Sequence, residues 1–571
     1  MKSIFVLLLL VAAIANSQAQ GNAQLGLTYL AERQYTSARN CLQLHLKANP
    51  GDLAAQLGLG DTYLALNEPE SAKVVFQKIL NANPQDPFAL AGMGKIALLN
   101  KDRSVETNYF ERARRANKSD PDIYCAISDG CLNLSRQDTV TALIYLRQGL
   151  DLFPKFSRLH LITGNLEAAK KNYGSAINAY ERAYFFDPKS AIAYREAGFI
   201  HLRSHSFQEA LKSLNKSIAI NPDQILGYRY LGDLFYSTGK YAEAEIAYQT
   251  YLERADVTSE DEERFAITLF FNKKYKEAET LLERVMTDSG DESVLLRIRG
   301  YIAYETGDIQ NGLTIMNRFF QLHYPQKFIA SDYGYCARLL QKAGKDSMAL
   351  YNFRKAVVLD PANTEFLEEL AKLASKNGLH PEAAACYNKL MELGADRSVN
   401  SFLVGKEYYF EGEQWRARYD SLKRLRKISK TPFNDSTTVK NEMYQYYHKA
   451  DSAFEVVSRL NEFYAGGYIW KGRIQSILDP EANTTAAKDN YQKALEILEK
   501  GDVAKNQKSI IECYKYLGSY YYLGYERFYQ SDKKLSGEMR SRCIECFTKI
   551  KSMDANDPQA NEVLARMKVD K

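Results

Sequence analysis

The sequence predicts an all-α solenoid built from helix–turn–helix repeats, and two regularities support this prediction. The first is the spacing of five prolines: every interval is 34 residues, except one that holds two repeats and two extra residues. These prolines are Pro50, Pro84, Pro154, Pro188 and Pro222. The second is that small and bulky residues recur at fixed positions within each interval. A period of this length is typical of stacked helix pairs, whose function lies on a surface rather than in a catalytic pocket.

The interval after Pro50 shows the repeated pattern most clearly. Gly60 and Tyr63 fall on its first helix, and Ala72 and Phe76 fall on its second. A residue without bulk is needed where the two helices cross most closely, and a small residue on the second helix must face it. This order of residues resembles the tetratricopeptide repeat. The resemblance implies a right-handed superhelix, and the spacing gives about fourteen repeats.

The same small, small and bulky positions can be followed along most of the chain. They are Gly26, Ala38 and Leu42; Gly164, Ala176 and Tyr180; Gly198, Ala210 and Leu214; Gly232, Ala244 and Tyr248; Ala266, Ala278 and Leu282; Gly300, Gly312 and Met316; Ala337, Ala349 and Phe353; and Ala371, Ala383 and Tyr387. We therefore expect residues 20–399 to form a regular repeat array.

The pattern is interrupted beyond residue 400. Residues 400–556 are expected to form divergent repeats with long inter-helix insertions, among them the turn at 479–485 and a stretch from about Gly524 to Arg540. These insertions are expected to project from one face of the solenoid. Residues 557–571 open with Asp-Pro and are expected to form a capping helix over the last repeat.

The first 19 residues have the pattern of a signal peptide. Lys2 precedes an apolar run from Ile4 to Ala15, and Ser17 and Ala19 supply the small residues that a signal peptidase requires. The mature chain is then expected to begin at Gln20, with no integral membrane segment after cleavage; a retained anchor is the alternative. The segment resembles signal peptides of secreted tetratricopeptide-repeat proteins of Bacteroides-type Gram-negative bacteria, which implies a periplasmic or outer-surface location.

Charge and cysteine content set limits on function. The 75 basic and 70 acidic residues nearly balance, so no nucleic-acid partner is expected. The densest basic segment, 423–427, is interpreted as a solvated helix face. The eight cysteines are dispersed and are interpreted as buried small hydrophobic residues, with a disulfide between Cys513 and Cys546 as an open alternative.

No catalytic, metal-binding or cofactor-binding motif in the sequence is expected to be functional. Gly92-Met-Gly94-Lys-Ile-Ala97 matches the dinucleotide fingerprint in letters, but it lies within a predicted repeat helix and follows no strand. Cys543 and Cys546 have the spacing of half a zinc site, yet no second pair or histidine cluster accompanies them. A non-enzymatic protein is therefore predicted. An enzyme hidden in the 400–540 insertions is the alternative.

The resemblance also implies a binding surface. In such superhelices the first helix of each pair lines a concave groove, and the residues three before and one after the small position point into it. The partner-binding residues predicted in this way, together with tyrosines one turn further on, are Arg195, Phe199, Arg229, Asp233, Tyr236, Arg297, Tyr301, Tyr304 and Arg338. Arginine and tyrosine together favour protein interfaces, and a series of guanidinium groups suits an acidic segment. The alternative is that these arginines pair with nearby acids such as Glu196 and Asp233.

The sequence thus predicts an exported scaffold that binds another protein or a peptide segment in its groove or at its C-terminal loops, in envelope protein assembly or transport. The other class considered is a glycan-uptake surface protein of the SusD-like kind, which also contains such repeats. That class would carry an acylated cysteine after the signal, whereas the first cysteine here, Cys41, falls within a repeat helix.

Overall fold

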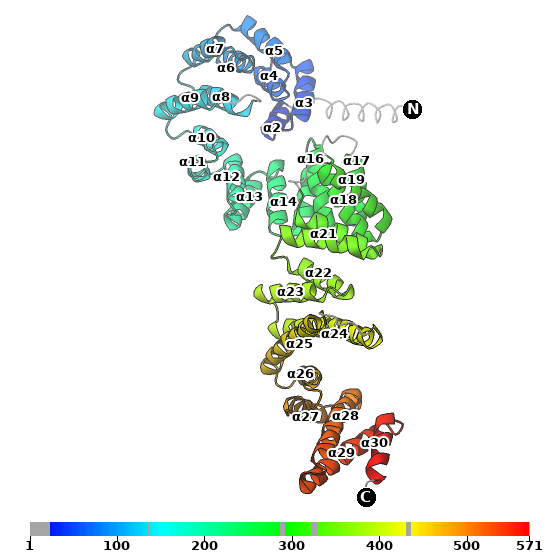
Figure 1. The fold of residues 1–571 in the computed structure, drawn as a ribbon. Coiled ribbons are helices and arrows are strands. Elements are labelled where there is room, and N and C mark those ends of the chain that lie inside the picture. The colour runs from blue at the N-terminus through cyan, green and yellow to red at the C-terminus, as the bar shows by residue number, and fades with distance from the viewer. Residues whose placement is uncertain (1–22, 135–137, 286–291, 323–327, 430–434, 570–571) are drawn as a thin grey trace, which may run out of the picture. The chain divides into compact units, whose positions relative to one another are not determined.

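The computed structural model describes residues 23–134, 138–285, 292–322, 328–429 and 435–569. Within these ranges the chain forms 29 α-helices, numbered α2 to α30, and no β-strand (Figure 1). The predicted all-α fold is confirmed. The predicted signal peptide, residues 1–19, lies outside the described residues.

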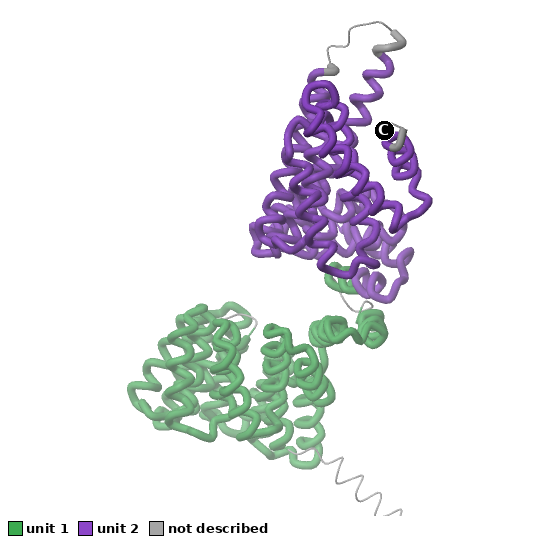
Figure 2. Tube along the Cα trace, turned by 90° about the horizontal axis from the view of Figure 1, so that it is seen from below, with its two compact units in different colours: residues 1–298 green, residues 299–571 purple. Residues whose placement is uncertain are grey.

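The chain divides into two compact units, residues 1–298 and 299–571, shown in two colours in Figure 2. In the first unit consecutive helices pair as antiparallel hairpins. The pairs are α2 (Ala23–Ala31) with α3 (Tyr35–Ala48), α4 (Leu53–Ala65) with α5 (Pro69–Ala82), α6 (Pro87–Leu99) with α7 (Arg103–Ala116), α8 (Pro121–Asn133) with α9 (Thr139–Leu152), α10 (Ser157–Ala169) with α11 (Tyr173–Phe186), α12 (Ala191–Arg203) with α13 (Phe207–Ile220), α14 (Ile225–Ser237) with α15 (Tyr241–Leu252), and α16 (Ser259–Phe271) with α17 (Tyr275–Val285).

The unit boundary falls within α18 (Ser293–Thr306), and the second unit continues the series. Its helices are α19 (Ile309–Gln321), α20 (Ala330–Lys342), α21 (Asp346–Leu359), α22 (Thr364–Lys376), α23 (His380–Glu392), α24 (Arg397–Ser429), α25 (Asp435–Leu460), α26 (Ala465–Leu478), α27 (Ala486–Glu499), α28 (Val503–Phe528), α29 (Lys533–Met553) and α30 (Pro558–Val569). The helices α2 to α29 make fourteen successive pairs in the described residues, which agrees with the predicted number of repeats.

The small residues that mark each repeat in the sequence lie where the two helices of a pair cross most closely. A methyl group added to Gly232 on α14 would lie 2.6 Å from the ring of Tyr248 on α15, and one added to Gly60 would lie 2.5 Å from the ring of Phe76. Each glycine therefore leaves the space that the bulky residue sixteen positions later fills. Ala72 and Ala244, the facing small residues, have no exposed surface. Gly94 of the apparent dinucleotide motif serves the same purpose against Phe110.

The helices of residues 400–556 differ from the prediction. Where an insertion was expected, residues 524–540 form the end of α28, a short turn and the start of α29, helices of 26 and 21 residues. Tyr525 and Ser536 are buried between them, so this stretch is packed rather than projecting. Likewise α24 runs for 33 residues through the basic segment, since no turn residue interrupts it after Gly412.

The turn at 479–485 is the one expected insertion in this region that the described residues contain as a loop. Asp479 accepts hydrogen bonds from the backbone N–H groups of Asn483 and Thr484. Arg527 on α28 donates to the carbonyls of Glu481 and Ala482. These bonds hold the loop against the next helix pair.

The C-terminal helix α30 covers the last hairpin. Asp557 accepts a hydrogen bond from Ala560 N, as an N-cap does, and forms an ion pair with Lys515 on α28 at 2.5 Å. Ala560 and Met567 are buried against the core of this region, while Glu562 and Arg566 face solvent as an ion pair.

Substitution of Gly232 by leucine tests the helix-crossing phase. The added side chain would overlap Tyr248, and we expect overpacking to lower the free energy of unfolding by about 1–3 kcal/mol or more. Gly174→Leu is the matched control, because no atom lies within 4 Å of a methyl group added there. Equal melting temperatures for the two variants would show that the crossing is not where we place it.

Candidate binding groove

The concave side of the first unit contains a groove of about 980 Å³ over α12, α14 and α16. Four of the predicted binding residues line it together, namely Phe199, Arg229, Asp233 and Tyr236. They come from two successive first helices, because the positions beside the small residue face this side in each repeat. This groove is the candidate binding site, and we call it the α12–α16 groove.

The position after the small residue also bonds to the second helix of its own pair. Tyr248 on α15 donates a hydrogen bond to Oδ1 of Asp233 at 2.5 Å, and Tyr180 donates to Oδ1 of Asn165 at 2.9 Å. The same two positions are thus joined in two repeats. Burial, followed by the Asp233 carboxylate, raises the pKa of the Tyr248 hydroxyl. This bond fixes the direction in which Asp233 enters the groove.

Ion pairs between neighbouring first helices occupy much of the groove wall. Asp233 accepts a hydrogen bond from Nη1 of Arg264 at 3.3 Å, and Arg264 also donates to Glu260. Arg229 lies 3.1 Å from Oδ1 of Asp261 and is a quarter exposed. The Asp233–Arg264 and Arg229–Asp261 pairs each join α14 to α16. These charges therefore already hold successive repeats together.

Aromatic rings form the apolar part of the groove. Phe199 on α12 stacks on Tyr230 on α14 with 4.5 Å between ring centroids. Tyr236 packs edge-on against Tyr241 and Phe271. Burial raises the pKa of Tyr230 to about 12, so this hydroxyl stays protonated at neutral pH. The rings offer a rigid contact area of the kind that protein interfaces use.

The interpretation of Arg195 as an exposed groove residue is wrong. Its side chain is 3% exposed. Nη1 donates to Glu32 on the α2–α3 turn at 2.7 Å, and Nη2 donates to Glu196 at 2.7 Å. The pairing with Glu196 that the sequence left open is thus present. Glu32, which lies far from Arg195 in the sequence, supplies the second carboxylate that pairs with this buried guanidinium.

In the second unit, the predicted residues bond mainly to one another and to nearby acids. The Tyr301 side chain is 5% exposed and donates to Asp332 at 2.7 Å. Arg338 is 8% exposed; it pairs with Glu365 and Glu369, and lies 5.9 Å from the ring centroid of Tyr304. These side chains connect successive helices and present little free charge. Arg297 of the first unit is partly exposed and lies outside the α12–α16 groove lining.

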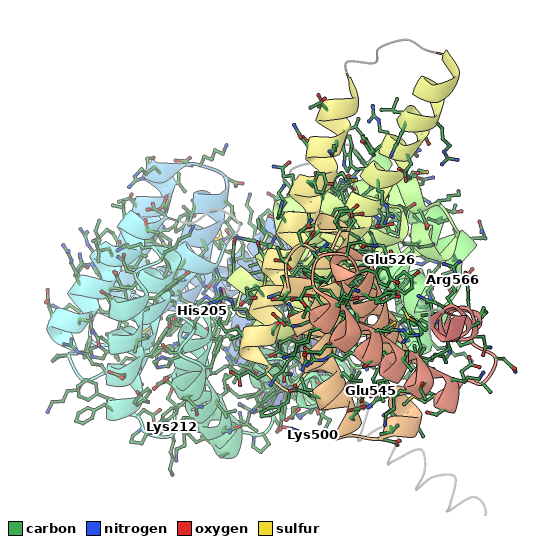
Figure 3. The ribbon with its side chains drawn as sticks, turned by 60° about the horizontal axis from the view of Figure 1, so that its bottom comes forward. His205, Lys212, Lys500, Glu526, Glu545 and Arg566 are labelled. Atoms are coloured by element: carbon green, nitrogen blue, oxygen red, sulfur yellow. The ribbon has the colours of Figure 1, made fainter. Side chains whose placement is uncertain are left out.

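Four basic residues of the groove were not predicted, and one of them, Arg264, pairs with Asp233 and Glu260 as described above. Arg33 lies on the α2–α3 turn, and Arg203 and His205 lie at the end of α12 and in the turn after it, where Figure 3 labels His205. They fall outside the two positions per repeat that are predicted to face the groove. Arg203 could have been noticed as a basic residue in the last turn of a predicted helix. Nothing in the sequence around Arg33 indicates that it lies in this groove.

Within the described part of the chain, Arg33 and Arg203 form no side-chain hydrogen bond or ion pair, and Arg33 interacts with Glu196 only through its charge. The acids of the groove do have partners: Glu196 is bonded to Arg195, Asp233 and Glu260 are bonded to Arg264, and Glu263 interacts as well. The groove therefore contains two arginines without a side-chain hydrogen bond or ion pair in the described residues, although, against the effect of its burial, the nearby Glu196 carboxylate raises the pKa of Arg33.

In the described residues no cluster of His, Cys, Asp and Glu side chains could hold a metal ion, and no helix is both long and apolar enough to cross a membrane. The cysteines are unbridged, and seven of the eight are buried, as Cys513 and Cys546 illustrate. Burial raises the pKa of the Cys543 and Cys546 thiols to about 12, which suits structural rather than reactive cysteines.

Sequence profiles of the tetratricopeptide repeat match residues 29–96, 136–191 and 181–372. Together these matches cover more than half of the chain, and they fall on helix pairs with the crossing geometry described above. This chain is a tetratricopeptide-repeat protein.

Curated relatives share short stretches with this tetratricopeptide-repeat protein. Small glutamine-rich tetratricopeptide repeat-containing protein 2 of Saccharomyces cerevisiae is 36% identical over 90 residues, which is 16% of this chain and 26% of the relative. The protein STIP1 homolog of Dictyostelium discoideum is 30% identical over 82 residues, 14% of each chain. The chain thus spans about a quarter or less of the length of these relatives.

Solved structures give similar matches. The C-terminal part of a TPR repeat-containing protein from Cytophaga hutchinsonii is 21% identical, with 52% of this chain and 98% of that chain covered and a TM-score of 0.36. The Cut9–Hcn1 hetero-tetramer of the APC/C is 15% identical, with 91% and 98% covered and a TM-score of 0.32.

Substitution of Arg195 by alanine is expected to destabilise the first unit. Removing the guanidinium would leave Glu32 and Glu196 buried without their shared cation, a loss of about 3–5 kcal/mol. Thermal or denaturant unfolding measures this effect. Arg203→Ala is the control and should unfold as the wild type does, because Arg203 is exposed. An Arg195→Ala variant of unchanged stability would contradict the structural role assigned here.

Proposed function

We propose that this protein is a non-enzymatic scaffold that binds an acidic segment of another protein in the α12–α16 groove. The observation that carries the proposal is the charge of that groove, where Arg33 and Arg203 form no side-chain hydrogen bond or ion pair in the described residues while Glu196, Asp233 and Glu260 are already bonded. A carboxylate entering the groove would gain charge-assisted hydrogen bonds without displacing an existing partner.

The shape of the groove favours an extended segment over a small molecule. It is open, about 980 Å³ in volume, and it follows three successive first helices rather than closing around one point. The stacked Phe199 and Tyr230 rings offer contact area for apolar side chains between the acidic ones. A segment that alternates acidic and apolar residues matches both features.

The tetratricopeptide-repeat family supports the general function of protein binding. The choice of an acidic partner segment rests on the groove itself. Tetratricopeptide repeats are protein-binding scaffolds, and the groove described here is the surface through which this chain would act. Envelope protein assembly or transport is the role we propose for the scaffold, since residues 1–19 have the pattern of an export signal.

Export to the periplasm or the outer surface is part of the proposal. Signal peptidase cleavage after Ala19 would give a mature chain that begins at Gln20. N-terminal sequencing of the protein from its own cells tests this directly. A chain that still begins at Met1 would contradict export by this signal.

Peptide binding tests the groove itself. A fluorescein-labelled peptide of alternating Glu and Leu is expected to bind residues 20–571, and a Lys–Leu peptide of equal length is not. Arg203→Glu should weaken binding of the acidic peptide by about tenfold, because a charge-assisted contact worth about 1–1.5 kcal/mol becomes a repulsion. Fluorescence polarisation at low and high salt gives the affinity, which should fall as salt rises.

The matched control is Lys212→Glu. This residue lies on α13, is exposed, and undergoes the same change of charge outside the groove (Figure 3). Its affinity should equal that of the wild type. If both variants lose affinity equally, binding follows net charge and the groove is not the site.

A further inference from the structure

The first repeat is bonded to the sixth and seventh repeats of the same unit. Glu32, on the α2–α3 turn, accepts a hydrogen bond from Arg195 Nη1 at 2.7 Å and another from the backbone N–H of Leu226 at 3.2 Å. The Glu32 and Arg195 side chains are each 3% exposed. The turn is therefore inserted between α12 and α14, which begin more than 150 residues later.

A second carboxylate binds the start of α3, directly after this turn. Asp256, in the connection between α15 and α16, accepts hydrogen bonds from the backbone N–H groups of Thr36 and Ser37 at 2.8 and 3.0 Å. It also accepts one from Ser37 Oγ at 2.5 Å. The N-cap residue of α3, Gln34, makes no side-chain capping bond. Asp256 thus supplies the cap of α3 across 220 residues, where a negative charge is favourable.

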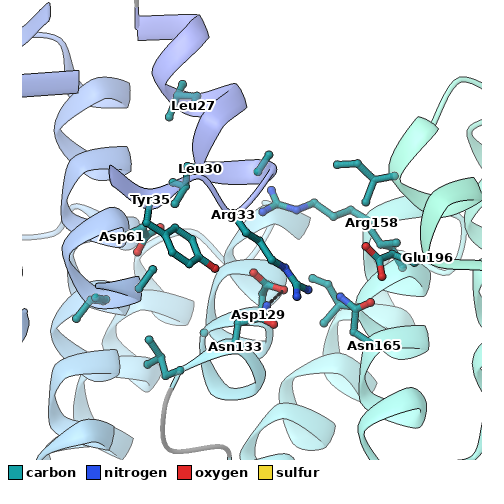
Figure 4. A pocket seen from close by; sticks show the side chains of 18 of the residues that line it. Leu27, Leu30, Arg33, Tyr35, Asp61, Asp129, Asn133, Arg158, Asn165 and Glu196 are labelled. Atoms are coloured by element: carbon teal, nitrogen blue, oxygen red, sulfur yellow. Dashed lines mark hydrogen bonds between the residues drawn. The ribbon is translucent and has the colours of Figure 1, made fainter. Parts of the chain in front are cut away.

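Arg33 lies at the tip of this turn, between the buried Glu32 and Gln34. Its φ of 59° is in the left-handed region, as is that of the turn residue in several other helix pairs, among them Lys171 and His205. Figure 4 shows the Arg33 side chain extending from the turn into a cavity of about 370 Å³ that Asp129 and Asn165 also line. Arg33 lines the α12–α16 groove as well.

We infer that the α2–α3 turn is a latch, closed by Glu32 and Asp256, and that closing it places Arg33 in the binding groove. This inference rests on the proposed function. Arg33 belongs to repeat one, whereas the groove is built from repeats six to eight, so only the latch brings this charge to the site. Glu32 and Asp256 are then positioning residues, and Arg33 determines the specificity of the groove for an acidic segment.

A double-mutant cycle tests the latch. The variant Glu32→Gln with Asp256→Asn keeps side-chain size but removes both charges, while Arg195 retains Glu196. Arg33→Gln removes the charge that the latch presents. Each change should weaken binding of the Glu–Leu peptide about fivefold, the effect of losing roughly 1 kcal/mol. The variant that carries all three substitutions should also bind the peptide about fivefold more weakly than the wild type, and no more weakly than that. The latch substitutions and Arg33→Gln act through the same guanidinium, so their effects should not add.

Two measurements separate positioning from a general loss of structure. Trypsin cleavage after Arg33, followed by mass spectrometry, should be slow in the wild type and at least about tenfold faster in the unlatched variant, as local opening controls proteolysis. Circular dichroism should stay unchanged. Asp223→Asn is the matched control, because it removes the charge of an exposed carboxylate that pairs with Arg254. It should alter neither cleavage nor binding.

The outcomes distinguish the latch from the proposed function. If the wild type does not bind the acidic peptide, the proposed function fails, and the role of Arg33 fails with it. If the wild type binds but Arg33→Gln has no effect, or the losses add, the latch inference alone is overturned. Equal cleavage after Arg33 in the wild type and the unlatched variant also overturns it.

Discussion

The close crossing of the two helices in each pair determines how every repeat of this protein presents its side chains. Gly60, Gly164 and Gly232 each leave the space that one ring of the second helix occupies. Because this contact fixes the rotation of the first helix, it also decides which positions face the concave side. The aromatic wall of the groove and the series of charges along it follow from that rotation.

The concave charges hold repeats together before they serve any partner. Arg264 joins Asp233, Arg229 joins Asp261, and Arg338 joins Glu369, each across about one repeat. A basic residue that faces the groove is thus not, for that reason alone, available for binding. What distinguishes the α12–α16 groove is that Arg33 and Arg203 have no such partner in the described residues. A basic residue that faces the groove and has no ion-pair partner within the protein is therefore a better indicator of a binding site than a basic residue that merely faces the groove.

Local residue patterns predicted the helix pairs, because helix crossing depends on residues about sixteen positions apart. The phase at Gly232 and Tyr248 and the number of pairs were predictable on this basis. The lengths of α24, α28 and α29 were not, since weak turn signals within a helix are overridden by packing between long helices. The burial of Arg195 was not predictable either, because its partner Glu32 is 163 residues away. Phe199 and Tyr236 were placed correctly by phase, whereas Arg33 reaches the groove only through the fold of the first unit.

Hydrogen–deuterium exchange of residues 20–571, with and without the Glu–Leu peptide, shows directly whether an acidic segment binds in the α12–α16 groove. We expect bound peptide to slow exchange in α12, α14 and α16 and in the α2–α3 turn, while the helices α24 to α29 exchange as before. The contradicting result would be protection confined to the helices of residues 397–553, or protection spread evenly over the chain, because neither would place the partner in the α12–α16 groove.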